Sequence, residues 1–231
     1  MSRPRYAVYL APAPQTALWR LASAVIGRDA ASGEACAFPE GAPCDAPDWA
    51  ALTAEPRRYG FHATLKAPFE LADGVEAAQL IAAAEAFAAG SRAFAIDDLE
   101  VALLGSFVAL RPATANAALD RLAADCVVLF EPHRAPLTPA ERARRVAGLT
   151  EARHVASVDR WGYPWVFEDF RFHMTLTGPL APERREAVRA GLAAIVEPVA
   201  RPLRVDALTL FVQEDRAAPF RVLRRLPFAA G

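Results

Sequence analysis

The chain has 231 residues, of which 54% are hydrophobic and 23% charged, and this composition excludes an intrinsically disordered protein. Its formal net charge of −1 provides no overall basic field for long nucleic acid, so a small substrate is expected. The three cysteines follow no metal-ligand spacing, and their odd number argues against a disulfide framework.

No apolar run approaches the length of a membrane span, and the N-terminal stretch MSRPRYAVYLAPAP has too few consecutive apolar residues for a signal peptide. We therefore expect a cytoplasmic protein without membrane contact.

The first half of the chain predicts strands and helices around one loop rich in proline and glycine. In chain order these are a strand at 5–10, a helix at 16–28, the loop at 30–47, a strand at 58–67, a helix at 75–89, and strands at 94–103 and 106–111. Asp73 is the expected N-cap of the helix at 75–89, and a turn at Leu104-Gly105 joins the last two strands.

The middle of the chain predicts a helical segment. Thr114 is expected to cap a helix that ends near residue 129. The sequence TPAE at 138–141 has the form of a capping box with proline at the first helical position, and it predicts an arginine-rich helix over 141–158. The turn WGYPW at 161–165 then leads into the next strand.

The last part of the chain repeats the order of elements found in the first part. It predicts a strand at 169–177, a helix at 182–198 with Pro182 in its first turn, and a hairpin formed by 203–212 and 220–228.

Two segments carry nearly the same dozen residues, RYGFHATLKAPF at 58–69 and DFRFHMTLTGPL at 169–180. The offset is 111 residues between His62 and His173, and 109 residues between Asp97 and Asp206 in the hairpins that follow. A near-constant offset across strand, helix and hairpin indicates internal duplication of a β-α-β-β unit.

The duplication predicts an α+β fold, bilobal, with two mainly antiparallel sheets related by a pseudo-twofold axis and with helices on the outside. We expect a single bilobal domain over 1–231. Its parts are an N-terminal lobe at 1–112 with the first His-x-Thr motif, a helical connecting segment at 113–164, and a C-terminal half at 165–231 with the second motif.

Strand alternation gives each motif an apolar face and a polar face. The polar faces hold Gly60, His62, Thr64 and Lys66 in the first copy, and Arg171, His173, Thr175 and Thr177 in the second. If the polar faces meet across the pseudo-twofold axis, two imidazoles and two hydroxyls converge in one cleft.

Two imidazoles suit phosphoester cleavage, because near neutral pH one can be neutral while the other is protonated. The neutral ring activates water or a hydroxyl, and the protonated ring gives its proton to the departing oxygen. Threonine hydroxyls can hydrogen-bond a phosphoryl oxygen, and Lys66 and Arg171 can offset its charge. The scheme needs no metal and no cofactor. A structural reading, in which each histidine only bonds its neighbouring threonine, stays open.

The paired His-x-Thr strands resemble the 2H phosphoesterase superfamily, and RYGFHATLKAPF, FVALRPA, the RAP of 134–136, WGYPW and FRFHMTLTG resemble a bacterial branch labelled as a phosphonate metabolism protein. The resemblance implies a catalytic cleft between two lobes, with His62 and His173 as the acid/base pair and Thr64 and Thr175 as phosphate binders. It also implies a small cyclic phosphate as substrate, such as a ribosyl 1,2-cyclic phosphate or a 2′,3′-cyclic nucleotide, and the residues do not select between them.

We therefore predict a metal-independent cyclic phosphodiesterase, with Lys66, Arg171, Thr177 and Tyr163 as further substrate-binding residues. Two alternatives are a metal-dependent phosphohydrolase and a non-catalytic module that binds a phosphorylated metabolite. The sequence leaves open which histidine is the base.

Several residues outside the motifs have two interpretations. His133 and His154 are expected at the surface rather than as metal ligands. The basic side chains of the middle helix predict either a solvated face or a clamp for a terminal phosphate, and they are Arg142, Arg144, Arg145 and Arg153. Tyr163 and Trp165 either stack on a base or ribose or pack the turn, and Arg171 could pair with Asp169.

Overall fold

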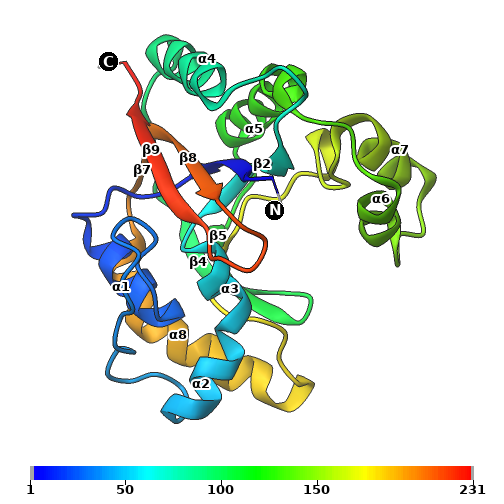
Figure 1. Cartoon of the computed structure of the whole chain (residues 1–231). Coiled ribbons are helices and arrows are strands. Elements are labelled where there is room, and N and C mark those ends of the chain that lie inside the picture. Colours follow the sequence, from blue (N-terminus) through cyan, green and yellow to red (C-terminus); the bar gives the residue numbers. More distant parts are fainter. Residues whose placement is uncertain (1–2, 230–231) are drawn as a thin grey trace.

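The computed structural model describes residues 3–229, and within them it shows the α+β class that the sequence predicts. The strands are β1 (Arg5–Leu10), β2 (Ala63–Glu70), β3 (Phe94–Ile96), β4 (Leu99–Leu104), β5 (Phe107–Pro112), β6 (Met174–Thr175), β7 (Leu203–Val205), β8 (Ala207–Gln213) and β9 (Arg221–Pro227). Seven of them form one antiparallel sheet in the order β4-β5-β6-β2-β1-β8-β9, and β3 pairs with β7 in a second, small sheet (Figure 1).

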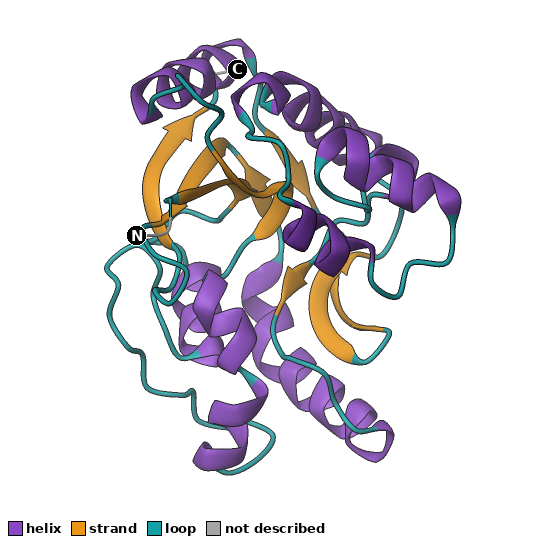
Figure 2. Cartoon of the chain, turned by 45° about the vertical axis from the view of Figure 1, so that its right-hand side comes forward, coloured by secondary structure: helices purple, strands orange, loops and turns teal. Residues whose placement is uncertain are grey.

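The helices gather above and below the large sheet (Figure 2). They are α1 (Ala17–Ile26), α2 (Ala46–Leu52), α3 (Ala54–Tyr59), α4 (Ala77–Gly90), α5 (Ala117–Leu129), α6 (Pro139–Val146), α7 (Ala152–Trp161) and α8 (Arg185–Ala200). In Figure 1, α4 and α5 lie above the strands, α1 and α8 lie below them, and α6 and α7 lie to one side. Within residues 3–229, no helix combines the length and apolar character needed to cross a membrane.

The two β-α-β-β repeats are interleaved. Strand β6 of the second repeat pairs with β5 of the first, and β3 of the first repeat pairs with β7 of the second. Helix α4 of the first repeat packs on β8 and β9, while α8 of the second repeat packs on β4 and β5. The helix of each repeat therefore covers the hairpin of the other repeat. The boundaries predicted for the two lobes and the connecting segment remain predictions.

The apolar faces of the two motif strands lie in the core, as alternation predicts. Their buried side chains are Phe61, Ala63 and Leu65 in the first copy and Phe172, Met174 and Leu176 in the second. His62, Thr64, His173 and Thr175 are half-buried on the opposite face. Three members of the predicted polar faces depart from this pattern, because Gly60, Lys66 and Thr177 are buried.

Two predicted elements are shorter or divided. The helix predicted over 141–158 is two helices, α6 and α7, because Gly148 adopts a left-handed conformation with φ of +80° between them. The strand predicted over 169–177 is limited to Met174–Thr175, since the preceding residues 167–169 form a 3-10 turn in which Phe167 has φ of +53°.

Two predicted helix caps are wrong and one is confirmed. The N-cap of α4 is Glu76 rather than Asp73, which forms an ion pair near the N-terminus. The N-cap of α5 is Asn116 rather than Thr114, because the Asn116 side chain accepts hydrogen bonds from the backbone N–H groups of the first turn. The capping box that begins α6 at Thr138 is present as predicted.

Met174 links the two halves of the large sheet, because its backbone pairs with Ala63 on one side and Leu110 on the other. Its side chain is fully buried. We predict that Met174→Ala lowers the free energy of unfolding by about 2–5 kcal/mol, the range for truncation of a buried methionine. Urea denaturation measures this change. The control Val128→Ala truncates a side chain that is 53% exposed and should change stability by less than about 0.5 kcal/mol; equal losses in the two variants would contradict the prediction.

Candidate active site

Strand β2 lies directly beside β6, and this pairing joins the two His-x-Thr motifs. The antiparallel register aligns Ala63 with Met174. Continued by one residue in each direction, it pairs each histidine with the threonine of the other motif, His62 with Thr175 and His173 with Thr64. Cross-strand neighbours have Cβ atoms about 4.5–5.5 Å apart, so the four polar side chains share one patch of one sheet face.

Both imidazoles are oriented by the same type of contact. Nδ1 of His62 lies 2.8 Å from the carbonyl oxygen of Gly60, and Nδ1 of His173 lies 2.7 Å from that of Arg171. A carbonyl oxygen only accepts, so each Nδ1 carries the hydrogen and each Nε2 is the atom that gains or loses a proton. Nε2 of His62 lies 3.3 Å from Oγ1 of Thr64.

His62 lies among aromatic rings. Its imidazole stacks on Tyr9 with 3.7 Å between ring centroids and an interplanar angle of 20°, and the ring of Phe211 is 6.1 Å away. The pKa of His62 is lowered to about 4, mainly by burial and also by positive charge on His173, while the hydrogen bond with the Gly60 carbonyl opposes the shift. His62 is therefore neutral at pH 7, with an unprotonated Nε2.

His173 is half-buried, with its ring centroid 5.8 Å from that of Phe107. Burial lowers the pKa of His173, and the hydrogen bond to the Arg171 carbonyl raises it. Charge on one ring disfavours charge on the other, so the pair binds its second proton less readily than its first.

Two adjacent cavities open on this face of the sheet. The first, of about 340 Å³, is lined by His62, Thr64 and Thr175, and the second, of about 280 Å³, is lined by Thr64, His173 and Arg171. Four lining residues are common to both: Thr64, Ala67, Phe107 and Tyr163. The two cavities are therefore neighbouring parts of one cleft that contains both motifs.

Two of the predicted substrate-binding residues, Lys66 and Thr177, contribute to the walls of the cleft, but their polar groups are engaged in the protein interior. The ammonium group of Lys66 donates to the carbonyl of Val127 over 2.9 Å and forms an ion pair with Glu131. The hydroxyl of Thr177 accepts from the Val108 backbone N–H at 3.0 Å. These contacts fix helix α5 and strand β5 against the motif strands.

The other two, Arg171 and Tyr163, lie at the cleft. Arg171 is exposed and donates through Nη1 to the carbonyls of Glu168 and Phe170. The alternative pairing of Arg171 with Asp169 is wrong, because Asp169 interacts with residues of α7 instead. Tyr163 lines both parts of the cleft.

The prediction that His154 lies at the surface is wrong. His154 is buried, its Nε2 lies 3.3 Å from Asp169 Oδ2, and its ring is 4.6 Å from that of Trp165. The 3-10 turn that holds Asp169 covers this side of α7, a contact that helix periodicity alone does not reveal. His133 is half-buried. Within residues 3–229, no group of three or more His, Cys, Asp or Glu side chains is arranged to hold a metal ion.

Three aromatic residues of the cleft, Tyr9, Tyr59 and Phe107, were absent from the sequence prediction. Tyr9 lies in β1, and the sheet pairs it with Thr64. Strand alternation alone could have shown only that Tyr9 shares a face with Arg5 and Ala7. Its place beside His62 depends on β1 lying next to β2, which no local pattern in the sequence indicates.

A family described as "Protein of unknown function (DUF1045)" matches residues 64–221, which is more than half of the chain and includes the whole second motif. The chain belongs to the DUF1045 family. The DUF1045 match begins at Thr64, so His62 lies just outside it, while His173 and Thr175 lie within it.

Two curated relatives of this DUF1045 chain carry the name ribose 1,5-bisphosphate phosphokinase PhnN. The relative from Janthinobacterium sp. (strain Marseille) is 40% identical over 238 residues, covering 99% of this chain and 51% of the relative. The relative from Laribacter hongkongensis (strain HLHK9) is 38% identical over 225 residues, covering 95% and 51%. The chain thus spans about half the length of the curated relatives that it matches.

Solved structures similar to this DUF1045 chain include a phosphoesterase with a TM-score of 0.39, 16% identical over 97% of this chain and 98% of that one. Another is Escherichia coli LigT complexed with 3′-AMP, with a TM-score of 0.43 and 15% identity, which covers 99% of both chains. A third is ATU0111 from Agrobacterium tumefaciens, a conserved protein of unknown function, with a TM-score of 0.45 and 14% identity over 97% of this chain and 87% of that one.

The two threonines of the second motif segment, Thr175 and Thr177, differ in what their hydroxyls contact, and this difference predicts unequal effects of replacement on stability. Thr177→Val leaves the buried Val108 N–H without its acceptor, so we expect a loss of about 1–3 kcal/mol in the free energy of unfolding. Thr175→Val alters a hydroxyl that faces the cleft and should change stability by less than about 0.5 kcal/mol. Urea denaturation of the two variants tests this. A larger loss of stability for Thr175→Val than for Thr177→Val would contradict the placement of the Thr175 hydroxyl in the cleft and of the Thr177 hydroxyl on the Val108 N–H.

The lowered pKa of His62 predicts a titration midpoint near 4 by NMR of its ring Cε1–H signal. The unfolded-state pKa is about 6.5, so the unfolded chain binds the proton more readily between these values. Stability contributed by neutral His62 is therefore present above pH 6.5 and is lost as the pH falls towards 4. A His62→Gln variant should show a weaker loss of stability over the same pH range. A midpoint near 6.5 would show that the ring is solvated.

Proposed function

We propose that the protein is a metal-independent phosphodiesterase that opens a small cyclic phosphate ester by two-histidine acid/base catalysis. The observation that supports this most directly is the register of β2 and β6, which sets two imidazoles and two hydroxyls on one patch of sheet face. The shared hydrogen-bonding pattern of the two rings adds to it, since both leave Nε2 directed away from the backbone.

In this mechanism His62 is the base and His173 the acid. Neutral Nε2 of His62 accepts a proton from water as the water oxygen attacks phosphorus. The bond from phosphorus to one ring oxygen breaks, and Nε2–H of protonated His173 donates its proton to that oxygen. The product is a phosphate monoester with a free hydroxyl. The environment supports the assignment of His62 as the base, because burial keeps its imidazole neutral.

The threonines hold the phosphoryl group in this proposal. Thr64 and Thr175 come from opposite strands, so their hydroxyls can bind two different phosphoryl oxygens between the imidazoles. Arg171 and Tyr163 line the same cleft and contact the remainder of the substrate. Lys66 and Thr177 act indirectly, by holding α5 and β5 beside the motif strands.

A phosphorylated ribose is the substrate class that we favour. The curated relatives are named for an activity on ribose 1,5-bisphosphate, and this chain corresponds to about half of their length. A cyclic phosphate of ribose belongs to the same class of compound. A ribosyl 1,2-cyclic phosphate is therefore the first substrate to test, with 2′,3′-cyclic nucleotides as the second.

Replacement of either cleft histidine should abolish turnover without unfolding the protein. We expect His62→Ala and His173→Ala each to reduce kcat at least about hundredfold, since acid/base groups typically contribute that much or more. Hydrolysis of ribosyl 1,2-cyclic phosphate and of 2′,3′-cyclic nucleotides, followed by phosphorus NMR, measures the loss. The control His133→Ala alters a histidine outside the cleft and should retain wild-type activity.

Other outcomes of the same assay would favour the alternatives. Full activity in either cleft variant would contradict the two-histidine mechanism. Activity that EDTA removes and zinc restores would identify a metal-dependent phosphohydrolase. Tight binding of the cyclic phosphate without a new phosphorus signal would identify a binding module.

A further inference from the structure

A third cavity, of about 880 Å³, borders the His62 side of the cleft. We call it the arginine cavity, and its charged lining residues are Arg5, Arg58, Arg144, Arg145, Arg216, Glu55, Glu70 and Glu141. Glu55, Tyr59, Ala67, Pro68 and Tyr163 line both this cavity and the His62 part of the cleft. A molecule held between the imidazoles can therefore extend into it past Tyr59 and Tyr163.

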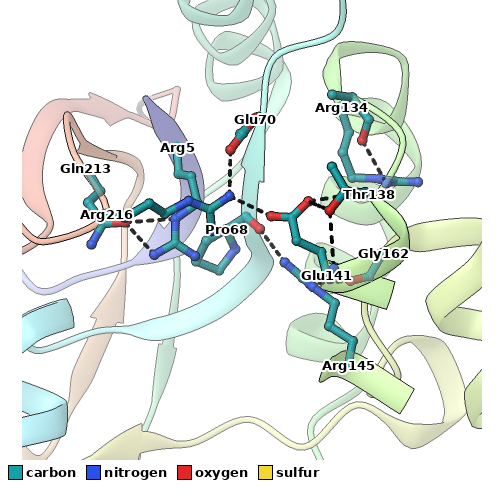
Figure 3. A network of polar contacts seen from close by, with 11 residues as sticks. Arg5, Pro68, Glu70, Arg134, Thr138, Glu141, Arg145, Gly162, Gln213 and Arg216 are labelled. Carbon is teal, nitrogen blue, oxygen red and sulfur yellow. Dashed lines mark hydrogen bonds and ion pairs between the residues drawn. The ribbon is translucent and has the colours of Figure 1, made fainter. Parts of the chain in front are cut away.

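The arginine cavity carries an excess of positive charge. Five arginines and three glutamates line it, which leaves two positive charges without a matching carboxylate. Two of the glutamates, Glu70 and Glu141, both pair with Arg216 (Figure 3). The remaining arginines have neutral partners or none among residues 3–229.

The partners of those arginines are carbonyl groups. Arg5 donates to the side-chain oxygen of Gln213, and Arg58 donates to the backbone oxygen of Arg216. Arg145 donates to the backbone oxygens of Pro68 and Gly162, as Figure 3 shows. These contacts satisfy hydrogen-bond donors but leave the charges uncompensated.

The uncompensated positive charges that line the arginine cavity repel one another, and Arg145 among them is partly desolvated. Burial lowers the pKa of Arg145, and the charges of Arg144, Arg5 and Arg134 lower it further, against only Glu141 in the other direction. A cation with cations around it and little water is unfavourable unless an anion is bound. An anionic ligand group would offset this repulsion.

A purely structural role explains some of these arginines and not others. Arg145 holds α6 against β2 through Pro68, and Arg216 joins β2 to α6 through its two glutamates. Arg144 lines the same cavity and is exposed, and its side chain makes no hydrogen bond or ion pair in the described part of the chain. Arg58 is also exposed and has only the one carbonyl partner.

We propose that the arginine cavity binds a terminal phosphate monoester of the substrate whose cyclic phosphate lies between the two histidines. The substrate is then a sugar or nucleotide with two phosphate groups, one cyclic and one terminal. This inference rests on the proposed function for the identity of the reacting group. The argument for the anion site depends only on the arginines.

Binding of ribose 5-phosphate tests the anion site without reference to catalysis. Isothermal titration calorimetry should detect ribose 5-phosphate and not ribose, with affinity that falls as NaCl is raised. Arg58→Gln and Arg144→Gln should each weaken binding about tenfold, since a hydrogen bond to a charged group contributes at least that much. Both side chains are exposed, so the variants should fold.

Arg142→Gln is the matched control for charge. Arg142 lies on the same helix, α6, but pairs with Asp159 and does not line the cavity. Its replacement should leave the affinity for ribose 5-phosphate unchanged. Equal losses in all three variants would show a diffuse charge effect, and no loss in Arg58→Gln and Arg144→Gln would overturn the proposed site.

A second measurement compares ribosyl 1,2-cyclic phosphate with and without a 5-phosphate. Wild-type kcat/KM should be at least about tenfold higher for the substrate with the 5-phosphate. Arg58→Gln and Arg144→Gln should each remove this preference and leave kcat/KM for the substrate without the 5-phosphate unchanged. Equal kcat/KM for the two substrates in the wild type would overturn the terminal-phosphate inference and leave the proposed function standing. If neither substrate is cleaved while ribose 5-phosphate binds in an Arg58- and Arg144-dependent way, the proposed function fails and the anion site stands.

Discussion

Backbone pairing between β2 and β6 aligns Ala63 with Met174, and the arrangement of the whole cleft depends on that register. Because side chains alternate along a strand, a slip of one residue would turn a histidine and a threonine into the core and bring apolar groups to the cleft. Strand β6 has only two residues, so its own hydrogen bonds are few. The buried side chains of Phe172, Met174 and Leu176 supply the remaining restraint, since exposing them would cost several kcal/mol.

The interleaving of the repeats connects this register to the rest of the molecule. Helix α4 packs on the β8–β9 hairpin and α8 packs on the β4–β5 hairpin, so neither repeat buries its own apolar surface alone. Strand β1 lies between the first motif strand and β8, and it carries Tyr9 to the face of His62. The walls of the cleft are therefore parts of the same core that stabilises the fold.

Two near-identical motifs acquire different electrostatics from these surroundings. His62 stacks on Tyr9 and has its pKa lowered to about 4 by burial, whereas His173 lies beside the exposed Arg171 and is only half-buried. In the mechanism that we propose, this asymmetry distinguishes the base from the acid, which the duplication by itself leaves equal. The arginine cavity, with its excess of positive charge, borders the His62 side of the cleft, and there we propose that a second anionic group of the substrate binds.

Features that depend on residues close together in the chain could be predicted from the sequence. The alternation around His62 and His173 predicts one polar face per strand, and the box at Thr138 predicts the start of α6, because periodicity and capping are local. The remaining features of the cleft depend on tertiary contacts. Tertiary structure placed Tyr9 on His62, turned Lys66 towards Glu131 and buried His154 beneath the 3-10 turn, because register, burial and charge are set by neighbours far away in sequence.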